Sequence, residues 1–524
     1  MESVPMKKIR VTDLIKKEDV EKWKPRDNIL IASPMGAGKS YFCKNTLYDI
    51  AKSVNGKILM LIHRSNCVEQ FQYEIEADGK ADVIEVITYQ SLEYSVLHNT
   101  NKFDLSKYMF VVCDEFHYFF NDSSFNNKTA ISFNMIMSNT ESVHVFMSAT
   151  GDHMARYMRK YIKDNGLEKA IEYEIPFDFS FIQQLTFFHK DKTMEEFLKE
   201  GVAKGDKGIF FIQSAEKAYK LYSKYKKYCV FNCSANNRKY YEYVDRNKIK
   251  DILINQRFNE QFLITTSCFD AGINIIDTDV KHIVIDIVDI GSLIQCIGRK
   301  RIQNEDDKLN IYIKIINNQK LAGLKRTMEK KIEMADFYMD NGYSVDKLIE
   351  KYPMQNDINN ILYDDLVYDQ NGNVIPNSYT KRINEPMYFK KKEDIADYSI
   401  MLKKFDTFGY CKYLALMFGF YDEGTGRFTY RMINEDYELN SYLQKMVKDE
   451  VVLLQLKDRS ELIKKINAKQ DGKLLKKADT LNKILEEREI DYRIKEFETT
   501  RNYTDENGNK KKKKYKSAWK VVPF

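Results

Sequence analysis

Short apolar runs, separated by longer polar or amphipathic stretches, recur along the first 320 residues of the chain. They are rich in Val, Ile, Leu, Met and Phe and do not alternate in polarity, which is typical of strands buried on both faces of a parallel sheet. The first series occupies residues 28–32, 57–62, 83–88, 109–115 and 142–150, and the second occupies 184–190, 208–214, 228–234, 261–267, 280–286 and 309–316. Two consecutive strand–helix series predict two doubly wound α/β domains, with the join near 165–182.

The pattern changes after about residue 320, where helical segments dominate. We expect helices over 321–341, near 395–420 and over 474–489. Asn371-Gly372 and Asn507-Gly508 lie between short runs of strand-forming residues, and each predicts a β-hairpin. The predicted domains are therefore 1–170, 171–320 and a mostly helical third domain, 321–524, that ends in a hairpin.

The excess of positive charge is concentrated at the C-terminal end of the chain. The 524 residues carry 83 Lys and Arg against 77 Asp and Glu, a net charge of +6. Residues 501–524 hold eight of the basic residues and two of the acids, so the final hairpin accounts for the whole excess. The eight cysteines form no CxxC pair, which argues against structural zinc and a disulfide framework and suits a reducing compartment. No leader or membrane-spanning run is evident, so we expect a cytoplasmic protein without membrane contact.

The sequence SPMGAGKS, residues 33–40, carries the clearest chemistry. It follows a predicted strand and precedes a predicted helix, the context in which backbone N–H groups and a helix N-terminus bind phosphates. Lys39 would then reach the β- and γ-phosphates, and the Ser40 hydroxyl would ligate Mg²⁺. The alternative is a glycine-rich turn without a ligand. The predicted nucleotide-binding residues are Pro34, Met35, Gly36, Ala37, Gly38, Lys39 and Ser40.

Two further strand ends carry candidate groups. Asp114 is placed to hold the Mg²⁺ shell, and Glu115 to polarise an attacking water. Ser148 and Thr150 follow the next strand, where their hydroxyls could bond to the acidic motif and to the neighbouring domain. Taken singly, Asp114-Glu115 is equally compatible with a solvated loop start, and for Ser148-Ala149-Thr150 an ordinary turn at a strand end is the favoured interpretation.

The order of these motifs resembles that of the DExH-type helicases of superfamily 2. The resemblance covers roughly 20–320 and includes IHRSNCVEQF (62–71), ITYQSL (87–92), IFFIQSAEKAYKLY (209–222), TTSCFDAGINI (265–275) and QCIGRKR (295–301). It implies two RecA-like domains that clamp ATP between them, with Mg²⁺ as the cofactor. It also implies that His117 couples the ATP state to the second domain and to nucleic acid.

The second half of the resemblance supplies residues from the second domain. Asp270 and Gly272 match the fifth motif, while Gln295 and Arg299 match the sixth, which makes Arg299 the expected arginine finger. Such enzymes usually have another arginine three residues after the first, and Ile302 occupies that place here. Arg301 lies one position early, so either Arg301 replaces the usual residue or one arginine acts alone.

The resemblance implies a nucleic-acid track as well. The matching positions are His63, Arg64, Thr88, Ser214, Thr265 and Thr266, for which helix caps or core hydrogen bonds are the alternatives. In the basic hairpin, Lys512 is a candidate contact to phosphates and Trp519 a candidate for stacking on bases. A solvated tail explains the composition of the hairpin equally well.

These expectations combine into a nucleic-acid-dependent ATPase that translocates along or unwinds its substrate. The motifs resemble those of restriction-type translocases and of phage or viral DNA helicases, so DNA is favoured over RNA, with a role in phage or mobile-element replication or recombination. The cytoplasm would be bacterial, or that of the host for a phage protein. Two alternatives use the same motifs: an ATP-gated binding or loading protein, and the motor subunit of a restriction or defence complex. The C-terminal domain leaves room for protein partners.

Overall fold

A computed structural model describes the chain in two compact units. The first comprises Met1–Leu185, Met194–Lys314 and Gly323–Ser399, and the second comprises Thr186–Thr193, Ile315–Ala322 and Ile400–Phe524. The described residues are 9–63, 65–98, 103–121, 129–149, 152–266, 274–353, 361–368, 374–405, 408–433, 437–470, 473–488, 490–504 and 510–523.

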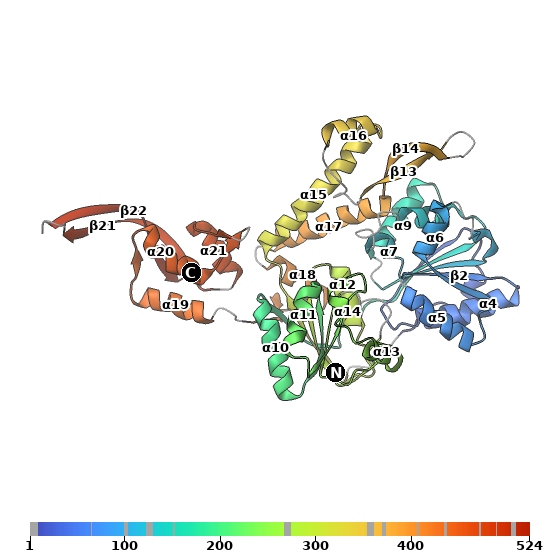
Figure 1. The fold of residues 1–524 in the computed structure, drawn as a ribbon, viewed down its shortest axis with the longest axis horizontal. Helices are drawn as coiled ribbons and strands as arrows, with labels where there is room; N and C mark the ends of the chain where they lie inside the picture. The colour runs from blue at the N-terminus through green and yellow to red at the C-terminus, as the bar shows by residue number, and fades with distance from the viewer. Residues whose placement is uncertain are drawn as a thin grey trace. The chain divides into compact units, whose positions relative to one another are not determined.

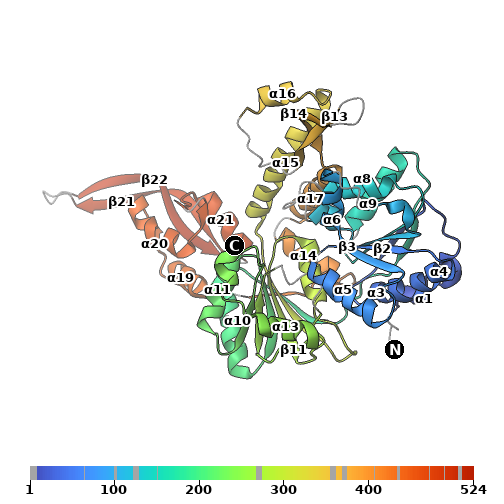
Figure 2. The ribbon, with the colours of Figure 1, turned by 45° about the vertical axis from the view of Figure 1, so that its right-hand side comes forward.

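A six-stranded parallel sheet forms the N-terminal domain, with helices on both of its faces (Figures 1 and 2). Its strand order is β3-β2-β4-β5-β1-β6. The sheet separates two apolar cores, because neighbouring residues of one strand face opposite sides: Ile29 and Ile31 belong to one core, and Leu30 to the other. The strands are β1 (Asn28–Ala32), β2 (Ile58–Ile62), β3 (Ile84–Thr88), β4 (Phe110–Asp114), β5 (Val143–Ser148) and β6 (Ile171–Glu174).

The helices of this domain follow the strands as the sequence pattern predicts. They are α1 (Val11–Leu14), α2 (Lys17–Val20), α3 (Lys39–Phe42), the π-helical turn η1 (Cys43–Leu47), α4 (Tyr48–Ser53), α5 (Ser65–Ala77), α6 (Tyr89–Leu97), the 3-10 turn η2 (Leu105–Lys107), α7 (Tyr118–Asn121), α8 (Thr129–Ser138) and α9 (Asp152–Asp164).

A second, seven-stranded sheet repeats this plan, with the strand order β17-β7-β12-β11-β8-β10-β9. Its edge strand β17 (Arg431–Met432) comes from later in the chain and pairs parallel with β7 at Thr186 and Phe187. Its strands are β7 (Ile182–Phe188), β8 (Lys207–Ile212), β9 (Cys229–Asn232), β10 (Phe262–Thr265), β11 (Val280–Asp286) and β12 (Leu309–Lys314). Its helices are α10 (Asp191–Lys204), α11 (Ala215–Lys224), α12 (Arg238–Tyr241), α13 (Arg246–Asn255) and α14 (Ile290–Gly298). The fold class is thus the predicted one, two tandem RecA-like parallel-sheet domains with a further C-terminal region.

The chain between the second sheet and the end of the first unit forms helices and a hairpin. These elements are α15 (Asn318–Asp340), α16 (Val345–Lys351), β13 (Leu362–Tyr368), β14 (Val374–Ile383) and α17 (Glu385–Lys404). β13 and β14 pair antiparallel, which confirms the hairpin predicted around Asn371-Gly372; its turn lies outside the described residues.

Helix α17 contacts both sheet domains of the first unit. Phe389 packs against Phe120 and Tyr157 on the first domain, at ring-centroid distances of 6.3 and 5.4 Å. On the second domain, Lys390 Nζ lies 3.6 Å from Oδ2 of Asp289, the residue that caps α14. Because α14 ends immediately before Arg299, α17 links the first domain to the element that carries the expected arginine finger.

The second unit holds a separate core near the C-terminus. α18 (Gly409–Met417), β15 (Tyr421–Asp422), β16 (Arg427–Phe428) and β17 (Arg431–Met432) precede it. The core itself lies between three helices and a sheet of order β18-β22-β21. Its elements are α19 (Tyr437–Lys448), β18 (Val452–Leu453), α20 (Leu456–Ile466), β19 (Lys469–Gln470), β20 (Lys473–Leu474), α21 (Ala478–Glu487), β21 (Tyr492–Thr504) and β22 (Lys510–Pro523). The predicted terminal hairpin is present as β21 and β22. In the part of the chain that the structure describes, none of the helices combines the length and the apolarity that a membrane span requires.

Candidate active site

A cavity of about 390 Å³ lies between the two sheet domains, and all of its walls belong to the first unit. One wall is the phosphate loop with the ends of β2 and β4, and the other is the end of α14 with the segment that follows it. The residues that carry charge or hydrogen-bonding groups into it include Lys39, Ser40, His63, Asp114, Glu115, His117, Gln256, Asn274, Gln295, Arg299 and Arg301. The two groups of motifs that were far apart in the sequence therefore line one space.

The phosphate loop owes its shape to two glycines and to the neighbouring strand. Gly36 and Gly38 have φ values of +82° and +86°, which side chains other than glycine rarely adopt. The Ser33 N–H donates to the Ser148 carbonyl at 3.0 Å. Helix α3 begins at Lys39, whose buried ammonium donates to the carbonyl of Ser33 at 2.9 Å. Burial lowers the pKa of Lys39, while Glu115 and Asp114 oppose that change.

The two adjacent carboxylates at the end of β4 are electrostatically different. Burial, helped by the charge of Glu115, raises the pKa of Asp114 to about 7. Burial acts on Glu115 in the same direction, but His117, Lys39 and Arg299 outweigh it and hold the pKa of Glu115 below its usual range. Glu115 also has φ +50°, a backbone strain that persists only where surrounding contacts impose it. The arrangement therefore keeps Glu115 ionised and fixed in direction.

His117 joins three motifs across the two domains. Its Nε2 accepts from the Gln295 amide at 2.6 Å, across 178 positions of the chain. Because that nitrogen accepts, the proton belongs on Nδ1, which faces Ser148 Oγ at 2.9 Å and Glu115 Oε2 at 3.3 Å. Any change in the separation of the domains must therefore break or lengthen the bond to Gln295.

Arg299 and Arg301 both face the phosphate loop from the second domain. A Cβ atom on Gly36 would lie 3.6 Å from Arg301 Nη1, and one on Gly298 would clash with the Met35 side chain at 2.5 Å. The Arg301 Nε donates to Asn274 Oδ1 at 2.7 Å, whereas Arg299 Nε and Arg301 Nη1 are buried and have no hydrogen-bond partner among the described residues. Burial and the neighbouring Arg299 lower the pKa of Arg301 to about 10, so it stays charged at neutral pH.

The cavity thus gathers three cationic side chains, two of them with unpartnered donors. Guanidinium groups buried this way are costly unless an anion with several oxygens pairs with them. A triphosphate supplies such oxygens, and the residues present fit it. They also fit Mg²⁺, since the Ser40 hydroxyl and the Asp114 carboxylate line the same wall; when bound there, the ion would neutralise phosphate charge.

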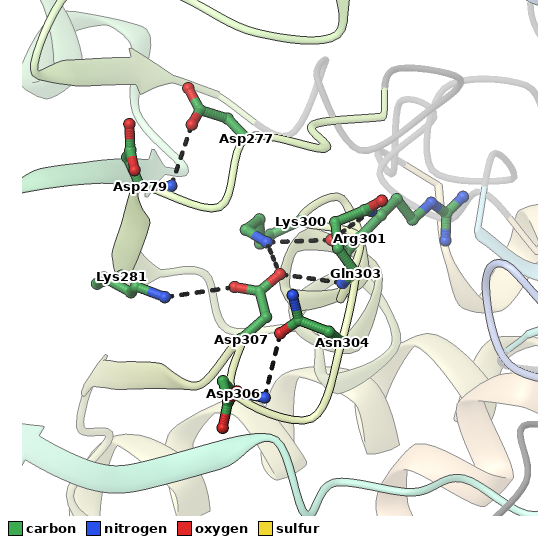
Figure 3. Close-up of polar contacts among 9 residues, drawn as sticks. All are labelled: Asp277, Asp279, Lys281, Lys300, Arg301, Gln303, Asn304, Asp306 and Asp307. Carbon is green, nitrogen blue, oxygen red and sulfur yellow. Dashed lines mark hydrogen bonds and ion pairs between the residues drawn. The ribbon is translucent and has the colours of Figure 1, made fainter.

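A buried ion pair fixes the backbone between the two arginines (Figure 3). Lys300 Nζ contacts Asp307 Oδ2 and donates to the Arg301 carbonyl at 3.0 Å, and both charged side chains are at most 1% exposed. Asp307 also accepts from the Gln303 N–H at 3.0 Å. On the other side, Ile275 forms a parallel bridge with Lys300. Lys300 therefore points into the domain while Arg299 and Arg301 face the cavity.

We expect Asp307→Asn to destabilise the second domain by about 3 to 5 kcal/mol, because it leaves the Lys300 ammonium buried without a counter-charge. The ATPase rate should fall with it, since the segment between the arginines loses its anchor. Lys300→Met combined with Asp307→Leu should recover most of the stability, because an apolar pair of similar volume carries no buried charge. Urea denaturation of the three proteins measures this. Equal stability of Asp307→Asn and wild type would show that the pair contributes nothing.

The residues that the resemblance assigned to nucleic acid occupy varied positions. Thr88 and Ser214 accept from backbone N–H groups as caps of α6 and α11, and Thr265 and Thr266 are buried. His63 lines the cavity, with its ring centroid 6.5 Å from that of His117. Four predicted site residues, Arg64, Thr150, Asp270 and Gly272, lie outside the described residues.

The terminal hairpin corrects one prediction. Trp519 is 2% exposed in the core of the second unit and stacks with the Arg459 guanidinium at 4.3 Å, so it is not available to stack on bases. Lys512 is exposed on β22, as a phosphate contact requires.

Three contributors to the site escape sequence reasoning. Asn274 orients Arg301, Asp307 anchors Lys300, and the Tyr89 hydroxyl donates to the Asp114 carbonyl at 2.9 Å. Asn274 lies in the motif TTSCFDAGINI and Tyr89 in the motif ITYQSL, so the resemblance places both near the site without giving them a role. Nothing in the sequence distinguishes Asp307 from the acids beside it.

Residues 2–153 match the family model of the type III restriction enzyme res subunit. The match covers the first sheet domain from its N-terminal end to the start of α9 and supports the resemblance at the level of superfamily 2. A comparison with curated proteins found no match.

Solved structures with a related arrangement include three helicases. Dbp5 of S. cerevisiae bound to RNA and ADP BeF3 is 18% identical, with a TM-score of 0.42 over 56% of this chain and 79% of its own. The DEAH/RHA helicase HrpB of Escherichia coli is 16% identical, with a TM-score of 0.39 over 55% and 40%. The DUF1998 helicase MrfA bound to DNA and AMPPNP is 13% identical, with a TM-score of 0.41 over 57% and 47%. Likenesses of this size give no information on what this chain binds.

Proposed function

We propose that this protein is a nucleic-acid-stimulated ATPase of the superfamily 2 type that translocates along or unwinds its substrate. One observation carries the proposal: Lys39, Glu115 and Arg299 line a single cavity although they come from two domains. A nucleotide held there touches both domains, so its hydrolysis changes the contacts that hold them together. The DNA preference rests on the resemblance to restriction-type translocases and on the match to a restriction-enzyme subunit.

Within this proposal each residue has a defined task. Lys39 and the loop amides bind the phosphates, and Ser40 and Asp114 would hold Mg²⁺. Glu115 accepts the proton of the attacking water, and Arg299 and Arg301 stabilise the charge on the transferred phosphoryl group. His117 senses the closed cleft through Gln295.

We expect the ATPase rate to rise at least tenfold with the preferred nucleic acid, measured against a panel of single- and double-stranded DNA and RNA. Lys39→Ala should abolish turnover with every member, because the phosphates lose their buried cation. Lys44→Ala is a matched control, since Lys44 is a neighbouring lysine paired with Glu74 at 2.6 Å. A rate that no nucleic acid changes would contradict the proposal.

The same protein in a strand-displacement assay separates the motor from an ATP-gated loading protein. Stimulated hydrolysis without displacement of a strand or of a triplex would favour the loading protein. Stable co-purification with a nuclease or methyltransferase would instead favour a motor subunit of a restriction complex, the alternative to which the family match lends support.

A further inference from the structure

We propose that the outer part of the terminal hairpin inserts into the major groove of duplex DNA. We call this part the lysine ribbon: the strand positions Thr500–Thr504 of β21, paired antiparallel with Lys510–Lys514 of β22. The proposal adds a duplex contact that needs no ATP to the function proposed above, and it concerns the second unit alone.

The lysine ribbon is an ordered extension of a packed core. Figures 1 and 2 both show β21 and β22 running on beyond the helices of their own unit. At their base, Ile494, Trp519 and Val521 belong to the apolar core. The side-chain amide of Asn482 on α21 bonds to both backbone groups of Ile494: its Oδ1 accepts from the Ile494 N–H at 2.7 Å, and its Nδ2 donates to the Ile494 carbonyl at 2.9 Å. A ribbon anchored in this way is held in one direction before it meets a ligand, which lowers the entropy cost of binding.

The charge of the ribbon is distributed over both of its faces. Successive residues of a strand face opposite sides, so Lys510, Lys512 and Lys514 lie on one face and Lys511 and Lys513 on the other. All five are exposed. A flat phosphate surface would contact one face only, whereas the walls of a groove present phosphates to both. This two-sided pattern therefore favours a groove.

The five paired positions of the opposite strand, Thr500–Thr504, include a further cation and no acidic residue. Arg501 stands directly across from Lys513, a like-charged cross-strand pair that is unfavourable on its own. The acids of β21 are Glu496, which contacts Ser517, and Glu498, which pairs with Lys514 at 2.7 Å; Asp505 and Glu506 are outside the described residues. A polyanion would relieve this repulsion.

The dimensions suit B-form DNA. Five paired positions extend about 13 Å at about 3.3 Å per residue, and the B-DNA major groove, about 12 Å wide and about 8.5 Å deep, admits a two-stranded ribbon. The major groove of duplex RNA is too narrow for protein side chains. Single strands are held largely by stacking on aromatic rings; the five β22 positions of the ribbon are all lysines, and of the aromatic residues that follow them Tyr515 is half-buried and Trp519 buried. Duplex DNA is therefore the favoured ligand.

The test measures affinity of the full chain, without nucleotide, for a 20-bp DNA duplex across a salt series. We expect Lys511→Gln, Lys512→Gln and Lys513→Gln together to weaken binding at least tenfold at about 0.1 M salt. The slope of log K against log salt should fall by about 2 to 3, at about 0.9 for each lost phosphate contact. The matched control replaces Lys448, Lys457 and Lys464, three exposed lysines of α19 and α20, and should change affinity less than twofold. Equal losses in both variants would overturn the proposal.

Three further arms test the ligand and the groove. A duplex RNA or single-stranded DNA bound as tightly as duplex DNA would overturn the choice of ligand. Methylation of guanine N7, which lies in the major groove, should weaken binding by wild type but not by the ribbon variant; no effect on wild type would overturn groove insertion. If the lysines only protect the strand edges, the variant will aggregate and keep its affinity, which also contradicts the proposal.

Failure of this inference is distinguishable from failure of the proposed function. Lys39→Ala should lose ATP hydrolysis and keep duplex affinity, whereas the ribbon variant should keep the basal ATPase rate and lose duplex affinity.

Discussion

Glu115→Gln should lower the rate of ATP hydrolysis by about 10² to 10⁴, the contribution of a positioned general base, while nucleotide affinity changes little. The amide has the shape of the carboxylate but cannot accept the proton of the attacking water. His117, Lys39 and Arg299 keep Glu115 ionised in the wild type, so the carboxylate is present in the form that can accept this proton. Single-turnover hydrolysis with saturating nucleic acid measures the step, and titration with a fluorescent ATP analogue measures binding.

Two variants define what the result means. Glu76→Gln removes the same charge from an exposed position on α5 and should hydrolyse ATP at the wild-type rate. Asp114→Asn should instead weaken Mg²⁺-dependent nucleotide binding, because Asp114 would hold the ion. If Glu115→Gln hydrolyses ATP as fast as wild type, the assignment of the base is wrong.

The sequence predicts the strands well where both faces are buried. β2, with all five residues buried, and β5, with all six buried, appear in the sequence as unbroken apolar runs. β6 does not, because IEYE alternates half-buried and exposed positions at the edge of the sheet. For the same reason the boundary region near 165–182 gave no strand signal.

The site is predictable residue by residue but not as an assembly. The phosphate-loop pattern singles out Lys39 from its local context, whereas Asp114 and Glu115 are singled out by the order of the motifs along the chain. The bond from Gln295 to His117 depends on how two domains close over each other, which no local pattern encodes. For Trp519 the local pattern is misleading. Its place after a lysine run predicts a surface that stacks on bases, whereas contact with Arg459, 60 positions earlier in the chain, holds it in a core.

Arg301→Ala should lower the rate of hydrolysis by about 10³ or more, the magnitude associated with an arginine finger, and Arg299→Ala should do the same. The structure gives the reason why the second arginine stands two positions after the first and not three. Arg299 ends α14 in the helical conformation, with φ −66° and ψ −33°. The Arg301 N–H then donates to the Ile275 carbonyl at 2.8 Å in the bridge at Lys300, which turns Lys300 inward to Asp307 and leaves Arg299 and Arg301 lining the cavity.

A position swap tests that explanation directly. Arg301→Ile with Ile302→Arg restores the spacing usual in superfamily 2 and keeps the composition unchanged. Because the bridge at Lys300 sets the direction of position 301, the swap moves the guanidinium away from Gly36 and the phosphate loop, so it should lose as much activity as Arg301→Ala. Both proteins should keep the stability of wild type, measured by urea denaturation, since Lys300 and Asp307 remain paired. Wild-type hydrolysis by the swapped protein would mean that either position can reach the phosphates, and the orientation inferred from the Lys300 anchor would be wrong.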